Sequence, residues 1–206
     1  MSGLFIAFEG GEGVGKSTQE GLLAAFLEEQ GHTVARTREP GGTPAAEVIR
    51  HLVLSHDYAG LNPRSEALLF AAARGDHVDR VIKPALGRGE IVICDRYIDS
   101  SVAYQGVGRE LGVDWVRNLS LWATHDLVPD LTIVLTADPE LTLARVTNHD
   151  RLESEPMEYH RAVTQAFLDL AAREPHRYVV IDATGDVDSI ARTISARVLE
   201  EIAAHS

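Results

Sequence analysis

Cysteine is almost absent from this chain of 206 residues, in which Cys94 is the single example. One thiol cannot form an internal disulfide, and it cannot supply a metal site built from several thiolates. Such sparing use of cysteine is typical of a reducing compartment. We therefore expect a cytoplasmic protein.

Long hydrophobic runs are missing as well. Charged residues interrupt the apolar stretches well before the roughly 18 residues that a bilayer-spanning helix needs. The N-terminal segment MSGLFIAFEGG has no basic region and no cleavage site. We expect neither a membrane protein nor a secreted one. Eight prolines and 17 glycines are also too few for a disordered or collagen-like chain.

Basic residues are outnumbered by acidic ones, 19 against 31, which gives a net charge of −12. That is the wrong sign for a surface that binds long nucleic acid by displacing counterions from phosphates. We therefore expect no long nucleic acid partner. A small anionic ligand remains compatible with this charge, provided that a few Arg and Lys residues gather at one site.

The apolar residues that are present alternate between strand-like runs and helical patterns. Runs such as 91–94 and 131–135 are apolar on both faces, as expected for a parallel sheet covered by helices on both sides. The sequence predicts an α/β fold, a doubly wound five-stranded parallel sheet, as one domain over residues 1–206. The polar segment 147–157 is a candidate mobile lid. Expected strands are 4–9, 33–37, 91–95, 131–136 and 178–182, and expected helices are 16–30, 45–54, 65–86, 114–124, 139–146, 158–173 and 187–204.

A phosphate-binding loop, or P-loop, follows the first expected strand and precedes the first helix. Residues 10–17 match G-x-x-x-x-G-K-[ST], in which backbone N–H groups surround phosphate oxygens at the positive end of a helix. Lys16 is expected to bridge the β- and γ-phosphates, and Ser17 to bind Mg²⁺. A glycine-rich turn without a ligand is the structural alternative. The predicted ATP-binding residues of the loop are Gly10, Gly11, Glu12, Gly13, Val14, Gly15, Lys16, Ser17 and Thr18.

Several other classes of nucleotide-binding protein do not fit. The Asn-Lys-x-Asp motif of GTPases is missing, and the loop does not match the dinucleotide pattern G-x-G-x-x-G. The strand at 91–95 ends in Asp95 followed by Arg96, whereas motor-type ATPases usually have Asp-Glu there. Asp95 is expected to orient Mg²⁺, and Arg96 suits a second anion at the carboxyl end of the sheet. A purely structural ion pair is the alternative for these two residues.

Beyond the P-loop, a set of motifs in fixed order resembles the bacterial thymidylate kinases over nearly the whole chain. The most specific of them is DRYIDSSVAYQG at 95–106. This resemblance implies a nucleoside monophosphate kinase fold that transfers the γ-phosphoryl of ATP to dTMP with Mg²⁺, usually as a homodimer. The other motifs are FEGGEGVGKST (8–18), TREPGGT (37–43), EALLFAAAR (66–74), VIKPAL (81–86), DRLE (150–153) and IDAT (181–184).

The resemblance also implies roles for residues of the dTMP site. Phe70 is expected to stack on thymine and Arg74 to bind the edge of the base, whereas Phe70 taken alone would fit a helix core equally well. Arg96 is expected to hold the acceptor phosphate, with Arg38 as a second candidate. Further expected contacts are Ser101 and Gln105 with the acceptor, Tyr104 beside the 2′ position of the sugar, and Glu12 facing the sugar and phosphate.

The lid is expected to supply a catalytic cation. No arginine occurs among positions 11–14 of the P-loop, so the resemblance assigns this role to Arg151, with Arg145 as a second clamp on ATP. Phosphoryl transfer depends mainly on positioning and charge neutralisation, which makes such a cation important. The lid differs from the usual arginine-rich form, because it has few arginines and no glycine.

Two other interpretations remain open at this point. The chain could be a P-loop kinase that acts on another monophosphate or on a nucleoside; Phe70, Arg74, Ser101 and Tyr104 favour thymine and deoxyribose over these. It could also be a nucleotide-dependent switch that holds ATP without phosphorylating a small acceptor. The pairing of Arg96 with Arg151 favours an enzyme.

Overall fold

The computed structural model describes residues 3–147 and 149–205. Met1, Ser2, Asn148 and Ser206 lie outside the described residues. The expected lid is therefore described except at position 148.

A parallel sheet lies at the centre of the described structure, and its strand order brings the P-loop to the middle. The order is β2-β3-β1-β4-β5, and every neighbouring pair is parallel. The chain adds β2 and β3 on one side of β1 and then β4 and β5 on the other. Ligands of open α/β sheets bind at such a change of direction, outside the carboxyl ends of the strands. The strands are β1 (Leu4–Gly10), β2 (Val34–Arg38), β3 (Ile91–Asp95), β4 (Leu131–Thr136) and β5 (Tyr178–Asp182).

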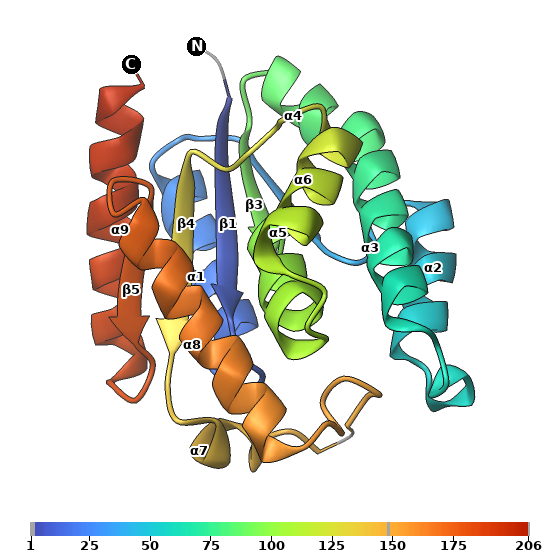
Figure 1. Ribbon diagram of the computed structural model, residues 1–206. Coiled ribbons are helices and arrows are strands. Elements are labelled where there is room, and N and C mark those ends of the chain that lie inside the picture. The colour runs from blue at the N-terminus through green and yellow to red at the C-terminus, as the bar shows by residue number, and fades with distance from the viewer. Residues whose placement is uncertain (1–2, 148, 206) are drawn as a thin grey trace.

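Helices cover both faces of the sheet (Figure 1). The described helices are α1 (Lys16–Glu29), α2 (Pro44–Leu54), α3 (Pro63–His77), α4 (Lys83–Gly87), α5 (Ile98–Ser101), α6 (Val113–Thr124), α7 (Pro139–Leu143), α8 (Met157–Arg173) and α9 (Val187–Ala204), with a 3-10 turn η1 (His56–Tyr58) and π-helical segments η2 (Val78–Ile82) and η3 (Val102–Gly108). None of the helices in the described part of the chain combines the length and apolar character needed to cross a membrane.

The alternation of side chains along β1 shows how the two faces are filled. Ile6 and Phe8 pack in a core with α1 and α9, whereas Phe5 and Ala7 pack in a second core with η2, α5 and α6. In Figure 1, α8 crosses in front of the sheet and α1 lies behind it. The expected doubly wound α/β fold with five parallel strands is confirmed.

The structure differs from the predicted elements in two main places, and the expected helix 139–146 also ends three residues early, because α7 covers only Pro139–Leu143. The expected helix 65–86 is α3, η2 and α4 in succession, so a π-helical segment interrupts the regular helix. The second difference is the helical segment formed by α5 and η3 over residues 98–108, for which the sequence analysis assigned no helix. That segment contacts β1, α6 and α8. Its helical form therefore depends on packing against distant parts of the chain.

Candidate active site

The P-loop joins the carboxyl end of β1 to the first turn of α1. Gly13 has φ 67°, and a Cβ atom there would lie 2.1 Å from the backbone oxygen of Thr142. Only glycine tolerates both the positive φ and this close approach. The loop therefore packs tightly against α7 and turns around the amino end of α1. This is the geometry in which backbone N–H groups bind phosphate.

Lys16 lies inside the P-loop. Its Nζ donates hydrogen bonds to the backbone oxygens of Gly11 (2.8 Å) and Gly10 (3.3 Å). Burial, followed by repulsion from Arg96, lowers the pKa of Lys16. The ammonium group is thus held beside the loop, where the phosphates of a nucleotide would replace the two carbonyl partners.

Arg96 joins the P-loop to the start of the segment 98–108. Its guanidinium donates to Glu12 Oε1 (2.5 Å), to the backbone oxygen of Gly10 (2.9 Å) and to Ser100 Oγ (3.1 Å). The Tyr104 hydroxyl donates to the same Glu12 oxygen at 2.7 Å. Burial alone would raise the pKa of Glu12, but the charges of Arg96 and Lys16 outweigh it and lower that pKa to about 2. Glu12 is therefore a carboxylate at neutral pH.

Arg74 forms the buried end of the site. Its guanidinium donates to Glu39 Oε2 (2.7 Å), Ser120 Oγ (3.1 Å), Ser101 Oγ (3.0 Å) and the backbone oxygen of Tyr97 (3.0 Å). These contacts fix the plane of the guanidinium among groups that are themselves buried.

These residues surround one cavity of about 450 Å³ at the carboxyl end of the sheet. Six of the chain's 19 Lys and Arg residues line it, so positive charge gathers here in a protein of net charge −12. From the ATP side, the predicted residues in its lining are Glu12, Gly13, Gly15, Lys16, Ser17, Thr18 and Arg145. From the dTMP side they are Arg38, Phe70, Arg74, Arg96, Ser101, Tyr104 and Gln105, and the predicted Mg²⁺ ligand Asp95 lines the cavity as well.

The predicted site residues differ in how far they are exposed to the cavity. Gly10, Gly11 and Val14 belong to the loop without lining the cavity. The Arg38 side chain is about half exposed and forms two hydrogen bonds with Glu47. Gln105 is buried and donates to Glu66 Oε1 at 2.9 Å.

The structure does not place Arg151 in the cavity. Its side chain is buried and donates to Glu66 Oε2 (2.6 Å) and to the backbone oxygen of Val53 (2.7 and 3.0 Å). Glu66 lies on α3 and has no exposed surface. The predicted catalytic role of Arg151 therefore requires its side chain to leave this buried carboxylate. Arg145, by contrast, lines the cavity in the conformation described here.

Asp95 and Ser17 offer oxygen ligands for a divalent cation. Both line the cavity, and Asp95 Oδ1 is buried without a hydrogen-bond partner among the described residues. A buried carboxylate oxygen without a partner is costly unless a cation or water satisfies it. Hydroxyl and carboxylate oxygens are also the ligand type that Mg²⁺ prefers. The residues present therefore fit Mg²⁺.

A second cluster, Glu39, His77 and Cys94, has the side-chain spacing of a metal site but not its chemistry. Both carboxylate oxygens of Glu39 already accept hydrogen bonds, one from Arg74 and the other from the His77 ring. Burial raises the pKa of the Cys94 thiol well above its usual range, which disfavours the thiolate form that a metal ion would bind. A hydrogen bond joins Glu39 to His77, whereas the Cys94 thiol donates to the backbone oxygen of Arg96 at 3.1 Å.

Arg50 and Ser100 also line the cavity, although neither was among the predicted site residues. Arg50, on α2, donates to the backbone oxygen of Pro40 at 2.8 Å, across the turn that contains the cis peptide Glu39-Pro40. No motif marks Arg50, and only the fold brings α2 to the cavity. Ser100 lies inside the DRYIDSSVAYQG motif, which could have identified it.

Comparisons with known proteins show the family of this chain. The family model described as thymidylate kinase matches residues 8–194. Thymidylate kinases from Clavibacter sepedonicus and Leifsonia xyli subsp. xyli are 52% and 54% identical to this chain, over 99% and 95% of it and over 98% and 94% of their own lengths. A crystal structure of thymidylate kinase from Ehrlichia chaffeensis has a TM-score of 0.81 and 36% identity, and the match covers 97% of this chain and 100% of that one. The chain belongs to the thymidylate kinase family.

Proposed function

We propose that the chain phosphorylates dTMP to dTDP with the γ-phosphoryl group of ATP, in the cavity between the P-loop and the segment 98–108. One observation carries this proposal: the P-loop and the residues expected to bind dTMP line the same cavity. Family membership supports the same reaction.

On the ATP side, the chain supplies charge and N–H donors rather than a covalent intermediate. Lys16 would exchange the oxygens of Gly10 and Gly11 for those of the β- and γ-phosphates. The amino end of α1 adds its partial positive charge at the same place. Arg145 would approach the nucleotide from the segment after α7. Positioning and charge of this kind provide most of the catalysis in phosphoryl transfer.

On the dTMP side, each part of the acceptor would meet a matching group. Phe70 offers an aromatic face for the base, and Arg74 offers N–H donors for its carbonyl edge. Tyr104 is buried and its hydroxyl donates to Glu12. We expect its ring to fill the space that a ribose 2′-hydroxyl would need. Arg96, with Arg38 and Arg50 as further cations, would hold the acceptor phosphate. The acceptor oxygen would then face the γ-phosphate across Arg96.

Mg²⁺ is proposed to bind between Ser17 and Asp95. When bound, it would neutralise charge on the β- and γ-phosphates. Asp95→Asn removes the negative charge but keeps the shape of the side chain. We expect this variant to need at least about tenfold more Mg²⁺ for nucleotide binding, measured by titration calorimetry of ATP at several Mg²⁺ concentrations.

A labelled-phosphate experiment tests the proposed reaction. Incubation of the protein with [γ-³²P]ATP, dTMP and Mg²⁺ should move the label into dTDP, identified by chromatography. Lys16→Met keeps most of the side-chain length without the charge and should abolish the labelled product. Label released only as inorganic phosphate would contradict transfer to dTMP and favour a nucleotide-dependent switch.

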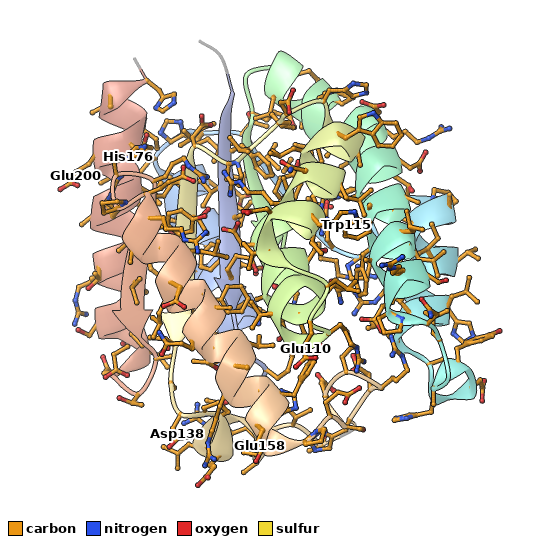
Figure 2. The ribbon with its side chains drawn as sticks, in the orientation of Figure 1. Glu110, Trp115, Asp138, Glu158, His176 and Glu200 are labelled. Carbon is orange, nitrogen blue, oxygen red and sulfur yellow. The ribbon has the colours of Figure 1, made fainter. Side chains whose placement is uncertain are left out.

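We also infer that the chain forms a homodimer through the α3–α6 face. Trp115 and Trp122 are two helical turns apart on α6, with 46% and 80% of their surface exposed, and Leu68 on the contacting helix α3 is 52% exposed. Figure 2 labels Trp115. Exposed apolar surface of this kind is typical of interfaces. Light scattering after size exclusion should give twice the chain mass, and Trp122→Glu should give the monomer mass.

We infer that the protein is cytoplasmic. Its single cysteine, Cys94, is buried and free, so the chain has none of the internal disulfides that are typical of oxidising compartments. Cell fractionation with antibodies against the protein tests this.

A further inference from the structure

His77, in the last turn of α3, is fully buried and is held from both sides of its ring. Nδ1 lies 3.0 Å from Glu39 Oε1, and Nε2 lies 2.6 Å from Thr37 Oγ1. A carboxylate only accepts hydrogen bonds, so Nδ1 carries the proton and donates to Glu39. The Thr37 hydroxyl can donate to Nε2 when this nitrogen carries no proton, and it can accept from Nε2 when it does.

The same Glu39 carboxylate continues the chain of contacts to Arg74. Its other oxygen, Oε2, accepts from Arg74 Nε at 2.7 Å. The four hydrogen bonds of the Arg74 guanidinium within the described residues leave one of its five N–H groups for a ligand. The direction of that N–H depends on the plane of the guanidinium. Glu39 is one of the four partners that hold this plane, and His77 in turn holds Glu39.

The backbone nearby leaves just enough room for the His77 ring. Gly42 has φ 87°, and a Cβ atom there would lie 2.5 Å from His77 Cδ2 and 2.6 Å from Nε2. The turn after β2 therefore places Glu39 and makes space for the histidine that orients it. His77 itself is not part of the cavity lining. Any effect on the acceptor must pass through Glu39 and Arg74.

Arginine carries donors only, which gives this network a consequence for base selection. Thymine presents a carbonyl oxygen at the position where cytosine presents an amino group, so one is an acceptor and the other a donor. An arginine N–H held at that position donates to the carbonyl oxygen of thymine, but it meets a second donor in the amino group of cytosine. We infer that His77 is a positioning residue that sets the preference for dTMP over dCMP, by holding Arg74 through Glu39. This inference rests on the proposed contact between Arg74 and the base.

Two substitutions of His77 separate its two hydrogen bonds. The amide nitrogen of His77→Asn takes the place of Nδ1 and keeps the donor to Glu39, whereas that of His77→Gln takes the place of Nε2 and keeps the contact with Thr37. We expect His77→Asn to stay within about threefold of wild type in the KM for dTMP. We expect His77→Gln to raise this KM about tenfold and to lower the dTMP-to-dCMP ratio of kcat/KM by at least about tenfold, with kcat changed less than about threefold. Thr37→Val, which removes only the far contact, is the matched control and should keep the ratio.

The melting temperature of each variant shows whether it is folded. If His77→Gln does not fold, Glu39→Gln takes its place, because it removes the charge that holds Arg74 Nε, and it should lower the same ratio. Equal behaviour of His77→Asn and His77→Gln would overturn the inference. So would a lower melting temperature of His77→Gln with an unchanged dTMP-to-dCMP ratio.

Arg74→Lys separates this inference from the proposed function. If Arg74→Lys keeps the preference for dTMP, the base contact of Arg74 fails, and the inference fails with it. If Arg74→Lys loses the preference while a folded His77→Gln keeps it, the base contact stands and the positioning role alone is wrong.

Discussion

At Arg96, one guanidinium touches both halves of the site. It binds the Gly10 oxygen and Glu12 of the P-loop and also Ser100, which lies in the first turn of the helical segment 98–108. The Glu12 carboxylate pairs with the Arg96 guanidinium, so this largely buried positive charge is neutralised. A phosphate at this point would compete with Glu12 for Arg96. These contacts hold the Arg96 guanidinium where the proposed acceptor phosphate would bind.

Phe70 is the residue at which stacking on the base can be tested. Phe70→Leu keeps an apolar side chain in the cavity wall and removes the aromatic face. Stacking of a base on an aromatic ring contributes about 1–3 kcal/mol, so we expect the KM for dTMP to rise roughly 5- to 150-fold. Steady-state kinetics with ATP saturating checks this, and the KM for ATP should stay the same. An unchanged KM for dTMP would show that Phe70 only packs in the core and does not stack on the base.

Glu9, at the end of β1, gives a prediction about pH. Burial, followed by the charge of Asp99, raises its pKa from 4.5 to about 7. Between these two pH values the folded protein holds a proton that the unfolded chain has lost, so the free energy of unfolding falls as pH rises from about 4.5 to 7. Glu9→Gln cannot titrate and keeps an oxygen acceptor for the backbone N–H groups of Tyr97 and Ser100.

Urea unfolding at pH 5 and pH 8 measures the effect of Glu9. The loss of stability between the two values should be smaller in Glu9→Gln than in wild type. Identical losses would mean that Glu9 does not hold its proton in the folded state.

Among the elements, the lid segment after α7 is the one whose position was least predictable. Asp150 Oδ1 accepts from the backbone N–H groups of Leu152 and Glu153, and Glu155 pairs with Arg109 on the acceptor side. Leu152 is buried in the core that contains Phe70 and Tyr104. The segment is therefore packed against residues that line the cavity.

Arg151 is the test of whether this segment also provides the catalytic cation. We predict that Arg151→Ala lowers kcat by a factor of about 10³–10⁵, the usual effect of removing such a charge. Glu66→Gln is the matched control, since it weakens the buried pair without removing the arginine, and it should lower kcat far less. Single-turnover measurements with ATP and dTMP check both variants. A loss below about tenfold for Arg151→Ala would show that its contact with Glu66 is its main role.

The elements that sequence patterns predict well are those whose cause is local. Strands β3, β4 and β5 begin and end where the apolar runs do, and the P-loop motif marks the start of α1. The segment 98–108 was missed because Ser, Gly and Tyr favour helix only weakly, and its helical form comes from contacts with β1, α6 and α8. The pairing of Arg151 with Glu66, 85 residues apart in the chain, has no local cause either. The position of Arg50 at the cavity has no local cause either, because it depends on where the fold places α2.

For the whole molecule, the strand order explains why the motifs converge. β1 ends in the P-loop, β3 ends in Asp95 and Arg96, and β2 leads into the Glu39–Gly42 turn, so the carboxyl ends of three neighbouring strands meet at one cavity. Figure 1 shows α7 and the lid segment at this same end of the molecule. The two chain ends lie at the opposite end. The chain carries a net charge of −12, whereas six of its Lys and Arg residues line this cavity.

The most direct test of the central claim is ADP release by the purified protein with ATP and Mg²⁺ against a panel of acceptors. The panel is dTMP, dUMP, UMP, dCMP, GMP, AMP and thymidine. We predict that kcat/KM with dTMP exceeds that with each of the others, and that thymidine, which lacks the phosphate for Arg96, gives no turnover above the rate without acceptor. A higher kcat/KM with another acceptor, or ADP release that does not depend on an acceptor, would contradict the account.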